Sequence, residues 1–207
     1  MRNHKTVAIL LNAPELDVGI KEKDIICADG GRRLLRGAFS SVLTVGDFDS
    51  LGAPPKDEET IACPVVKDYT DGERAIEIAA DKEYEEIVLY GYAGGRGDHV
   101  YANLSLLAYA DRLGLRAKAV SRNEIVRFYN GKEEIITVEA KKGDVISVLP
   151  FYDKAIVTDS DGLFYSYKDT ALTRTRALGI SNVATKENPT FTLKEGAVLV
   201  FTEKKTC

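Results

Sequence analysis

The sequence predicts an α/β N-terminal domain with a mainly parallel sheet, followed by a C-terminal all-β sandwich. In the first half, short apolar runs alternate with segments of helical periodicity, which is typical of a parallel sheet with crossover helices. From Lys132 to Cys207 the apolar runs are short, β-rich and separated by Gly, Asp and Pro, without a convincing helical pattern. We therefore expect two domains, residues 1–130 and 131–207, divided near Asn130–Glu133, where Asn130–Gly131 is a pair typical of hairpin turns.

The N-terminal half contains apolar runs of strand length that are rich in β-branched residues. We predict strands at Thr6–Leu11, Asp24–Ala28, Val42–Val45, Ile61–Val66, Ile87–Tyr90, Ala117–Ser121 and Ile125–Tyr129. Helices are expected to open near Arg32, to begin at Thr70 or Asp71, and to cover Tyr101–Leu115, where Gly114 supplies a stop signal.

The C-terminal half contains a second set of short runs, which we assign to the antiparallel sandwich. The predicted strands are Ile135–Val138, Val145–Leu149, Ala155–Thr158, Leu163–Tyr167, Thr190–Leu193 and Val198–Thr202.

Charge and composition exclude several classes of protein. The 207 residues carry a formal net charge of −4 and no Lys/Arg block, which argues against a nucleic-acid partner. Three cysteines without a C-x-x-C pair imply neither a disulfide framework nor a zinc site. The apolar run Val7–Leu11 is too short for a signal peptide or a spanning helix, so we expect a cytoplasmic protein without a membrane partner.

Two carboxylates follow the predicted strand Val42–Val45. Gly46 ends that strand and places Asp47 and Asp49 at its C-terminal end, the edge where open α/β sheets bind ligands. Residues two apart in an extended segment point the same way, so both carboxylates can face one site. Because adjacent like charges need a cation, and oxygen ligands suit magnesium, we predict a magnesium and polyphosphate site. An Asp-rich turn that caps backbone N–H groups is the alternative.

Further acidic residues follow two other predicted strands. Asp29 opens the turn Asp29–Gly30–Gly31, whose glycines let backbone N–H groups approach an anion, although a plain tight turn explains them as well. Asp71 either caps a helix with Glu73 in its acidic first turn or adds a third carboxylate to the cluster. Position along the chain does not separate these interpretations.

A glycine-rich loop follows the predicted strand Ile87–Tyr90. Residues 91–99 read G-Y-A-G-G-R-G-D-H, and their backbone amides can wrap phosphates while Arg96 adds a fork of donors. The loop matches neither a Walker A motif nor the Rossmann glycine pattern. For His99, a capping or packing role and a catalytic role both remain open.

The chain resembles the thiamin pyrophosphokinase family in the order and spacing of its motifs. These are A-D-G-G, G-D-F-D-S, K-D-Y-T-D and G-G-R-G-D-H, followed by L-G-I-S-N and L-K-E-G in the β-rich tail. The resemblance covers nearly the whole chain. It implies transfer of a diphosphoryl group from ATP, the co-substrate, to the hydroxyl of thiamin, giving thiamin diphosphate and AMP with Mg²⁺. It also implies a homodimer whose active sites lie between subunits.

The resemblance assigns roles to the residues that match the family's motifs. The aspartates that would hold magnesium and the phosphate chain are Asp29, Asp47, Asp49 and Asp71. The expected catalytic set is Asp47, Asp49, Asp71 and Asp98. From the chemistry of the transfer, we expect the general base to be one of the four magnesium-holding aspartates and not His99. Substrate and nucleotide contacts are expected from Asp29, Gly30, Thr70, Gly95, Arg96, His99, Ser181 and Asn182, the last two in a thiamin pocket contributed across the dimer.

Two other functions compete with this interpretation. A metal-dependent phosphohydrolase also uses Asp clusters and an Asp–His pair, but such sites commonly recruit several histidines, and the chain has only His4 and His99. A non-catalytic module that binds a nucleotide or thiamin diphosphate would use the same carboxylates without turnover.

Overall fold

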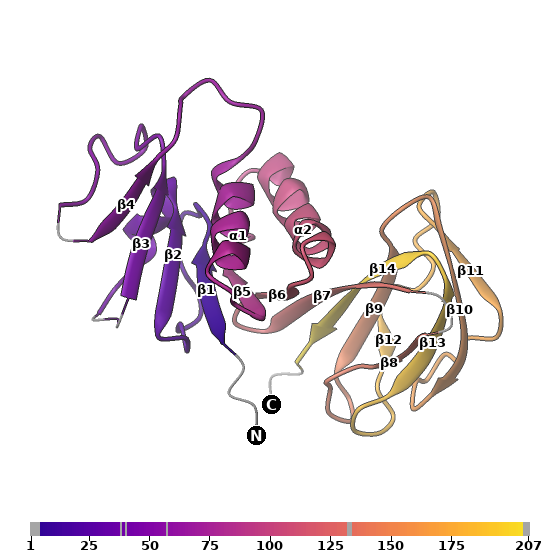
Figure 1. Cartoon of the computed structure of the whole chain (residues 1–207). Helices are drawn as coiled ribbons and strands as arrows, with labels where there is room; N and C mark the ends of the chain where they lie inside the picture. Colours follow the sequence, from indigo (N-terminus) through magenta and orange to yellow (C-terminus); the bar gives the residue numbers. More distant parts are fainter. Residues whose placement is uncertain (1–4, 38, 40, 57, 132–133, 205–207) are drawn as a thin grey trace. The chain divides into compact units, whose positions relative to one another are not determined.

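The computed structural model describes residues 5–37, 39, 41–56, 58–131 and 134–204. The chain divides into two compact units, Met1–Arg122 and Asn123–Cys207 (Figure 1). The strand β7 (Glu124–Asn130), which we assigned to the first domain, belongs to the second unit because it pairs with β14 (Ala197–Glu203) along its whole length.

The first unit is built on a parallel sheet with the strand order β6-β5-β1-β2-β3-β4. Its strands are β1 (Thr6–Leu10), β2 (Asp24–Ala28), β3 (Ser41–Gly46), β4 (Glu59–Ala62), β5 (Glu86–Tyr90) and β6 (Arg116–Val120). After β4 the chain returns to the other side of β1 to form β5. The order therefore reverses between β1 and β5, and in open α/β sheets such a switch point is where ligands bind.

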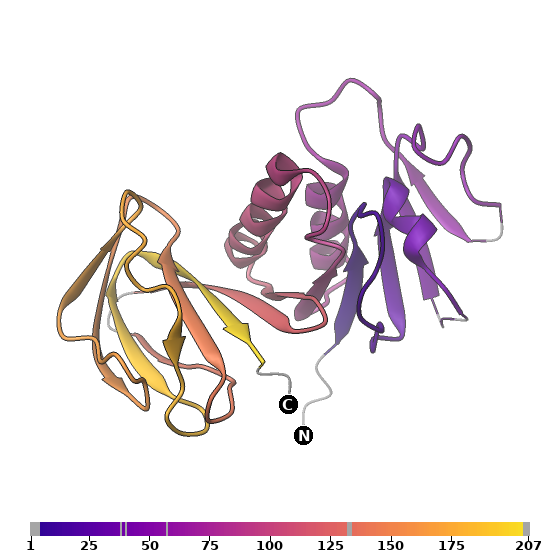
Figure 2. The same ribbon diagram turned by 180° about the vertical axis from the view of Figure 1, so that it is seen from behind.

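Helices cover both faces of this sheet. The helix α1 (Asp71–Asp81) contacts β1, β2 and β3, whereas the short 3₁₀ helix η1 (Asp29–Leu34) and the loop after β1 lie on the opposite face (Figure 2). The helix α2 (Gly97–Arg112) contacts α1 and β6 and is followed by Gly114, whose φ of +77° ends the helical path. The helix that we expected to open near Arg32 is thus a 3₁₀ helix that begins earlier, at Asp29.

The second unit is an antiparallel sandwich, as the sequence predicts. One sheet has the order β12-β9-β14-β7 and the other β11-β10-β13-β8. The remaining strands are β8 (Glu134–Thr137), β9 (Val145–Pro150), β10 (Lys154–Asp161), β11 (Thr170–Thr173), β12 (Asn182–Val183) and β13 (Thr190–Glu195). Buried side chains of both sheets, among them Val148 and Val200 of one and Leu172 and Phe191 of the other, form a single core.

Three local predictions were wrong, and in the first two an apolar pattern was given too much weight. The strand expected at Ile61–Val66 is β4, Glu59–Ala62, and Val65 and Val66 are 75% and 92% exposed. The segment Leu163–Tyr167 contributes only an isolated bridge from Leu163 to Ala184, while the edge strand β11 follows it.

The third wrong prediction is the hairpin at Asn130–Gly131. The strands on either side of this pair, β7 and β8, lie in different sheets, because β7 pairs with β14 and β8 pairs with β13. The pair therefore connects the two layers of the sandwich instead of two neighbouring strands.

Among the described residues, no helix has both the length and the apolar character needed to cross a membrane. Cys27 is buried and Cys63 is half-buried, and both are free thiols. Cys207 lies outside the described residues.

Candidate metal and phosphate site

Three carboxylates meet at the carboxyl edge of the parallel sheet. Asp29 directly follows β2, Asp47 directly follows β3, and Asp71 is the first residue of α1. One carboxylate oxygen of each lies within 4.8 Å of the others. Parallel strands end at the same edge of a sheet, so residues distant in sequence meet there. This acidic cluster of Asp29, Asp47 and Asp71 contains three of the four predicted magnesium ligands.

Asp29 gives the strongest indication that the cluster binds a cation. Asp29 is 7% exposed, and its Oδ1 atom is buried without a hydrogen-bond partner among the described residues. A buried carboxylate oxygen without a partner is costly, and a bound cation would remove that cost. The donors are all carboxylate oxygens, the set that Mg²⁺ prefers, so the residues present fit this ion.

Gly46 explains how Asp29 and Asp47 come so close. A Cβ atom added at Gly46 would lie 2.8 Å from the Cβ of Asp29, closer than such atoms approach in proteins. Any side chain at this position would push Asp29 away from the end of β3. The glycine is therefore required by the close approach of η1 to β3 at the site.

Lys67 places a positive charge inside the acidic cluster. Its Nζ lies 2.6 Å from Asp71 Oδ1 and 3.8 Å from Asp47 Oδ2, and its side chain is only 9% exposed. Burial acts to lower the pKa of Lys67, but the hydrogen bond and the charges of Asp71 and Asp47 outweigh it, so the pKa is raised. Burial raises the pKa of Asp71, the negative charges of Asp47 and Asp29 add to this, and Lys67 opposes it.

Asp49 does not join the cluster of three. Phe48 has a φ of +61° and is buried, so the segment from Asp47 to Asp49 is not extended and its side chains do not alternate as predicted. Asp49 is exposed, and its backbone N–H donates to Asp47 Oδ1 at 3.2 Å. The role of Asp49 as a magnesium ligand stays a prediction.

A pocket of about 580 Å³ opens beside the cluster. It is lined by the predicted residues Asp29, Thr70, Asp71 and His99. Residues that the sequence interpretation missed complete its wall, namely Asn12, Tyr101, Asn103 and Tyr109. Asn12 could have been found, because it follows β1 at the same sheet edge. The three α2 residues carry no motif, and only the packed helix reveals them.

A second pocket, of about 300 Å³, lies at the switch point between β1 and β5. The glycine-rich loop contributes Gly95 and Arg96, and His99 and Asn103 line both pockets. Gly30 is buried in η1, where an added Cβ would lie 2.7 Å from the side chain of Asn12. Gly30 therefore allows Asn12 to sit between η1 and the pockets.

Arg96 and Asp98 form an ion pair at the start of α2. Arg96 donates from Nε to Asp98 Oδ1 at 3.1 Å and from Nη2 to Oδ2 at 2.6 Å, and both side chains are largely exposed. The guanidinium lowers the pKa of Asp98. The backbone N–H of His99 also donates to Asp98 Oδ1, at 3.0 Å. Asp98 thus fixes the guanidinium group of Arg96 at the glycine-rich loop and is not part of the acidic cluster.

Ser181 and Asn182, the predicted thiamin contacts, lie in the second unit. Asn182 is 3% exposed, and its side-chain amide accepts from the N–H of Tyr165 at 3.0 Å and donates to its carbonyl at 2.8 Å. Ser181 has a φ of +56°, and its N–H donates to Ser147 Oγ at 3.0 Å. Asn182 therefore fixes the backbone that presents the exposed rings of Phe164 and Tyr165.

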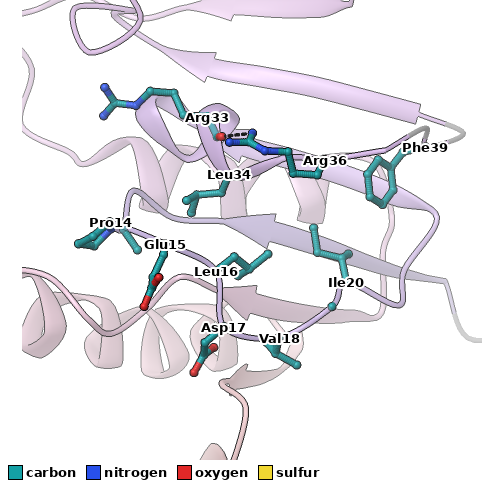
Figure 3. A pocket seen from close by; sticks show the side chains of 12 residues that line it. Pro14, Glu15, Leu16, Asp17, Val18, Ile20, Arg33, Leu34, Arg36 and Phe39 are labelled. Carbon is teal, nitrogen blue, oxygen red and sulfur yellow. Dashed lines mark hydrogen bonds between the residues drawn. The ribbon is translucent and has the colours of Figure 1, made fainter.

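A larger pocket, of about 870 Å³, lies away from these residues, between the loop Ala13–Ile20, η1 and Phe39 (Figure 3). The guanidinium of Arg36 donates to the backbone carbonyl of Arg33 there, and Glu15 and Asp17 lie across the pocket from the arginines. None of the predicted site residues lines it.

The first unit belongs to the class of open parallel α/β proteins that bind ligands at the carboxyl edge of the sheet, and here three carboxylates converge at that edge. Residues 19–119 match the family described as thiamin pyrophosphokinase, catalytic domain. This part of the chain is therefore similar to the catalytic domain of thiamin pyrophosphokinases.

Individual relatives show the same similarity. Thiamine pyrophosphokinase of Bacillus subtilis (strain 168) is 28% identical over 174 residues, which cover 81% of this chain and 80% of the relative. The crystal structure of the enzyme from Geobacillus thermodenitrificans superposes with a TM-score of 0.77 at 26% identity, covering 97% of this chain and 98% of that one. The structure from Bacillus subtilis gives a TM-score of 0.80 at 24% identity, covering 98% and 100%.

Proposed function

We propose that the chain is an ATP-dependent thiamin diphosphokinase, which transfers the diphosphoryl group of ATP to the hydroxyl of thiamin and releases AMP. The acidic cluster carries the proposal, because a buried Asp29 oxygen without a partner lies beside Asp47 and Asp71 at the carboxyl edge of the sheet. This arrangement suits a divalent cation with attached phosphates. The similarity to thiamin pyrophosphokinases supplies the two substrates.

The protein's part in this chemistry is positioning and charge neutralisation. Asp29, Asp47 and Asp71 would hold Mg²⁺, which, when bound, neutralises charge on the phosphate oxygens. Arg96 suits a phosphate through its fork of donors, and backbone N–H groups of the glycine-rich loop suit the remaining oxygens.

The reaction needs no covalent intermediate with the protein. The thiamin hydroxyl oxygen attacks the β-phosphorus of ATP, a new O–P bond forms, and the bond from that phosphorus to the oxygen of the α-phosphate breaks, so that AMP leaves. The hydroxyl proton passes to one of the aspartates. A strong base is not required, because the transition state depends mainly on in-line geometry and electrostatic stabilisation.

We further propose that the first unit, Met1–Arg122, binds the nucleotide and magnesium, and that the second unit, Asn123–Cys207, binds thiamin and forms a homodimer with active sites at the interface. Support comes from four exposed apolar side chains of the second unit, Phe164, Tyr165, Leu178 and Ile180, which we name together the apolar patch. Asn182 and Ser181 lie directly beside these segments. An exposed apolar patch rimmed by polar groups is typical of an interface.

Substituting Asp47 tests the function. Asp47→Asn keeps the shape of the side chain but removes a clustered charge, so we expect kcat/KM for thiamin-dependent AMP release to fall at least about 100-fold, roughly 3 kcal/mol of transition-state stabilisation. Asp81→Asn, which removes an exposed carboxylate at the far end of α1, should leave the rate unchanged. Near wild-type turnover by Asp47→Asn at saturating Mg²⁺ would refute the assignment.

The same assay separates the competing functions. AMP release that requires thiamin supports the diphosphokinase. ATP hydrolysis at the same rate with and without thiamin would instead identify a phosphohydrolase. Tight binding of nucleotide without turnover would identify a binding module.

A further inference from the structure

Lys67 is a buried cation that contacts the same carboxylates as the proposed metal. The loop that precedes α1 carries it into the acidic cluster, where its ammonium hydrogen-bonds Asp71 at 2.6 Å and lies 3.8 Å from Asp47. Only 9% of its side chain is exposed. A divalent cation on this cluster and the Lys67 ammonium would therefore compete for the same oxygen atoms.

The charges of the cluster explain why a lysine is tolerated in this position. Three carboxylates whose oxygen atoms lie within 4.8 Å of one another repel strongly when partly buried. One ammonium lowers that repulsion while a divalent cation is away. Lysine suits this role because its ammonium is a compact charge on a flexible stem and can move to a new partner without a change in the backbone.

We propose that Lys67 is a tethered counter-cation of the acidic cluster, which competes with free divalent metal and becomes a phosphate ligand when metal arrives together with a nucleotide. This inference rests on the proposed metal site. Displacing the ammonium from Asp47 and Asp71 is unfavourable unless it gains another anionic partner, and the phosphate chain of a metal–nucleotide complex supplies one. The cluster then loads metal with nucleotide in preference to metal alone.

Electrostatics gives the proposal a signature that a merely structural lysine would not produce. Free Mn²⁺ carries two positive charges, whereas its complex with an ATP analogue carries net negative charge. Removing the Lys67 charge should therefore strengthen binding of the free ion and weaken binding of the complex. A lysine that only held the loop in place would, when removed, weaken the binding of both ligands.

The experiment compares wild type, Lys67→Met and the control Lys82→Met. Methionine keeps the length of the apolar stem, and Lys82 forms only an exposed ion pair with Glu59 at 3.6 Å at the other end of α1. Binding of free Mn²⁺ is measured by electron paramagnetic resonance. Binding of the complex of Mg²⁺ with α,β-methylene-ATP, which lacks the bond that the reaction breaks, is measured by calorimetry.

For Lys67→Met we expect the Kd of Mn²⁺ to fall about tenfold and the Kd of the nucleotide complex to rise about tenfold. The positive charge of Lys67 repels the free ion, which is positive, and attracts the complex, which is negative, so removing it has opposite effects on the two ligands. Lys82→Met should match wild type in both. Unchanged or weaker Mn²⁺ binding by folded Lys67→Met, or unchanged binding of the complex, would overturn the proposal.

Circular dichroism establishes that each variant is folded, and Lys67→Arg, which keeps the charge, should bind free Mn²⁺ no more tightly than wild type. Failure of the proposed function itself would look different. In that case wild type would release no AMP in the presence of thiamin, whatever the behaviour of the lysine variants.

Discussion

At the scale of single residues, the contact between Gly46 and Asp29 decides whether the cluster forms. Gly46→Ala would place a Cβ 2.8 Å from that of Asp29, and neither atom lies at the end of a flexible side chain. We expect a loss of about 1–3 kcal/mol in the free energy of unfolding by urea, together with weaker Mn²⁺ binding, because Asp29 is displaced.

Gly19→Ala is the matched control for this prediction. Gly19 lies in the loop after β1, and no atom would lie within 4 Å of a Cβ added there. Its stability and Mn²⁺ binding should equal those of wild type. If Gly46→Ala bound Mn²⁺ as tightly as wild type, the close contact would not control the position of Asp29.

The same scale shows where sequence reasoning about the site reaches its limit. The sequence predicts that the carboxylates of Asp29, Asp47 and Asp71 lie close together, because each follows a predicted strand of a parallel sheet. The orientation of Asp49 could not, since it depends on the left-handed backbone of Phe48, which no pattern of apolar residues indicates. Lys67 stood in the K-D-Y-T-D motif, four residues before Asp71, but its burial depends on tertiary packing.

At the scale of elements, the first turn of α1 both starts a helix and supplies a ligand. Thr70 Oγ1 accepts from the N–H of Glu73 at 3.1 Å, and Glu73 Oε2 accepts from the N–H of Thr70 at 2.7 Å. This capping box fixes the turn that contains Asp71. The sequence left open whether Asp71 only caps the helix or joins the carboxylates; Thr70 is the cap, and Asp71 lies in the acidic cluster.

We predict that Thr70→Ala lowers the free energy of unfolding by about 1 kcal/mol, because the N–H of Glu73 loses its acceptor. Mn²⁺ binding should weaken as well, since the turn that carries Asp71 frays. Thr70→Ser keeps the acceptor oxygen and should retain most of both properties. Equal urea midpoints for Thr70→Ala and wild type would show that the cap does not stabilise α1.

The elements predicted well are those at the centre of a sheet, and the errors concern edges. β1, β2 and β5 are buried on both faces, so their apolar runs identify them. β4 lies at the edge of its sheet, and half of its residues are exposed. Val65 and Val66 are more apolar, so the predicted strand was extended to them although both are exposed. β11, also an edge strand, was missed for the same reason.

At the scale of the whole molecule, the residues of the proposed metal site and those of the proposed thiamin and dimer surface belong to different units. The acidic cluster and its pockets consist entirely of residues of the first unit, whereas the apolar patch and Asn182 belong to the second. A parallel sheet followed by a sandwich was predictable from the change in periodicity. The position of β7 was not, because its assignment depends on pairing with β14, far away in sequence.

This separation leads to a prediction for the proposed homodimer. Phe164→Ser removes one of the two exposed rings of the apolar patch, and the backbone of residue 164 stays fixed because its N–H donates to the carbonyl of Val183 at 2.9 Å. We expect sedimentation velocity to show a shift toward monomer, because aromatic anchors dominate interface energetics. Ile135→Ser, an exposed apolar position on β8, should leave the oligomeric state unchanged.

If the active sites lie at the dimer interface, the same variant should raise KM for thiamin while Mn²⁺ binding stays at the wild-type value, since the metal ligands all lie in the first unit. A parallel loss of Mn²⁺ binding would mean that the substitution disturbs the first unit as well. A dimeric Phe164→Ser with wild-type KM would exclude the patch from both roles, and the thiamin pocket would then have to be sought among the residues around the acidic cluster, where Tyr101 and Tyr109 supply the aromatic walls.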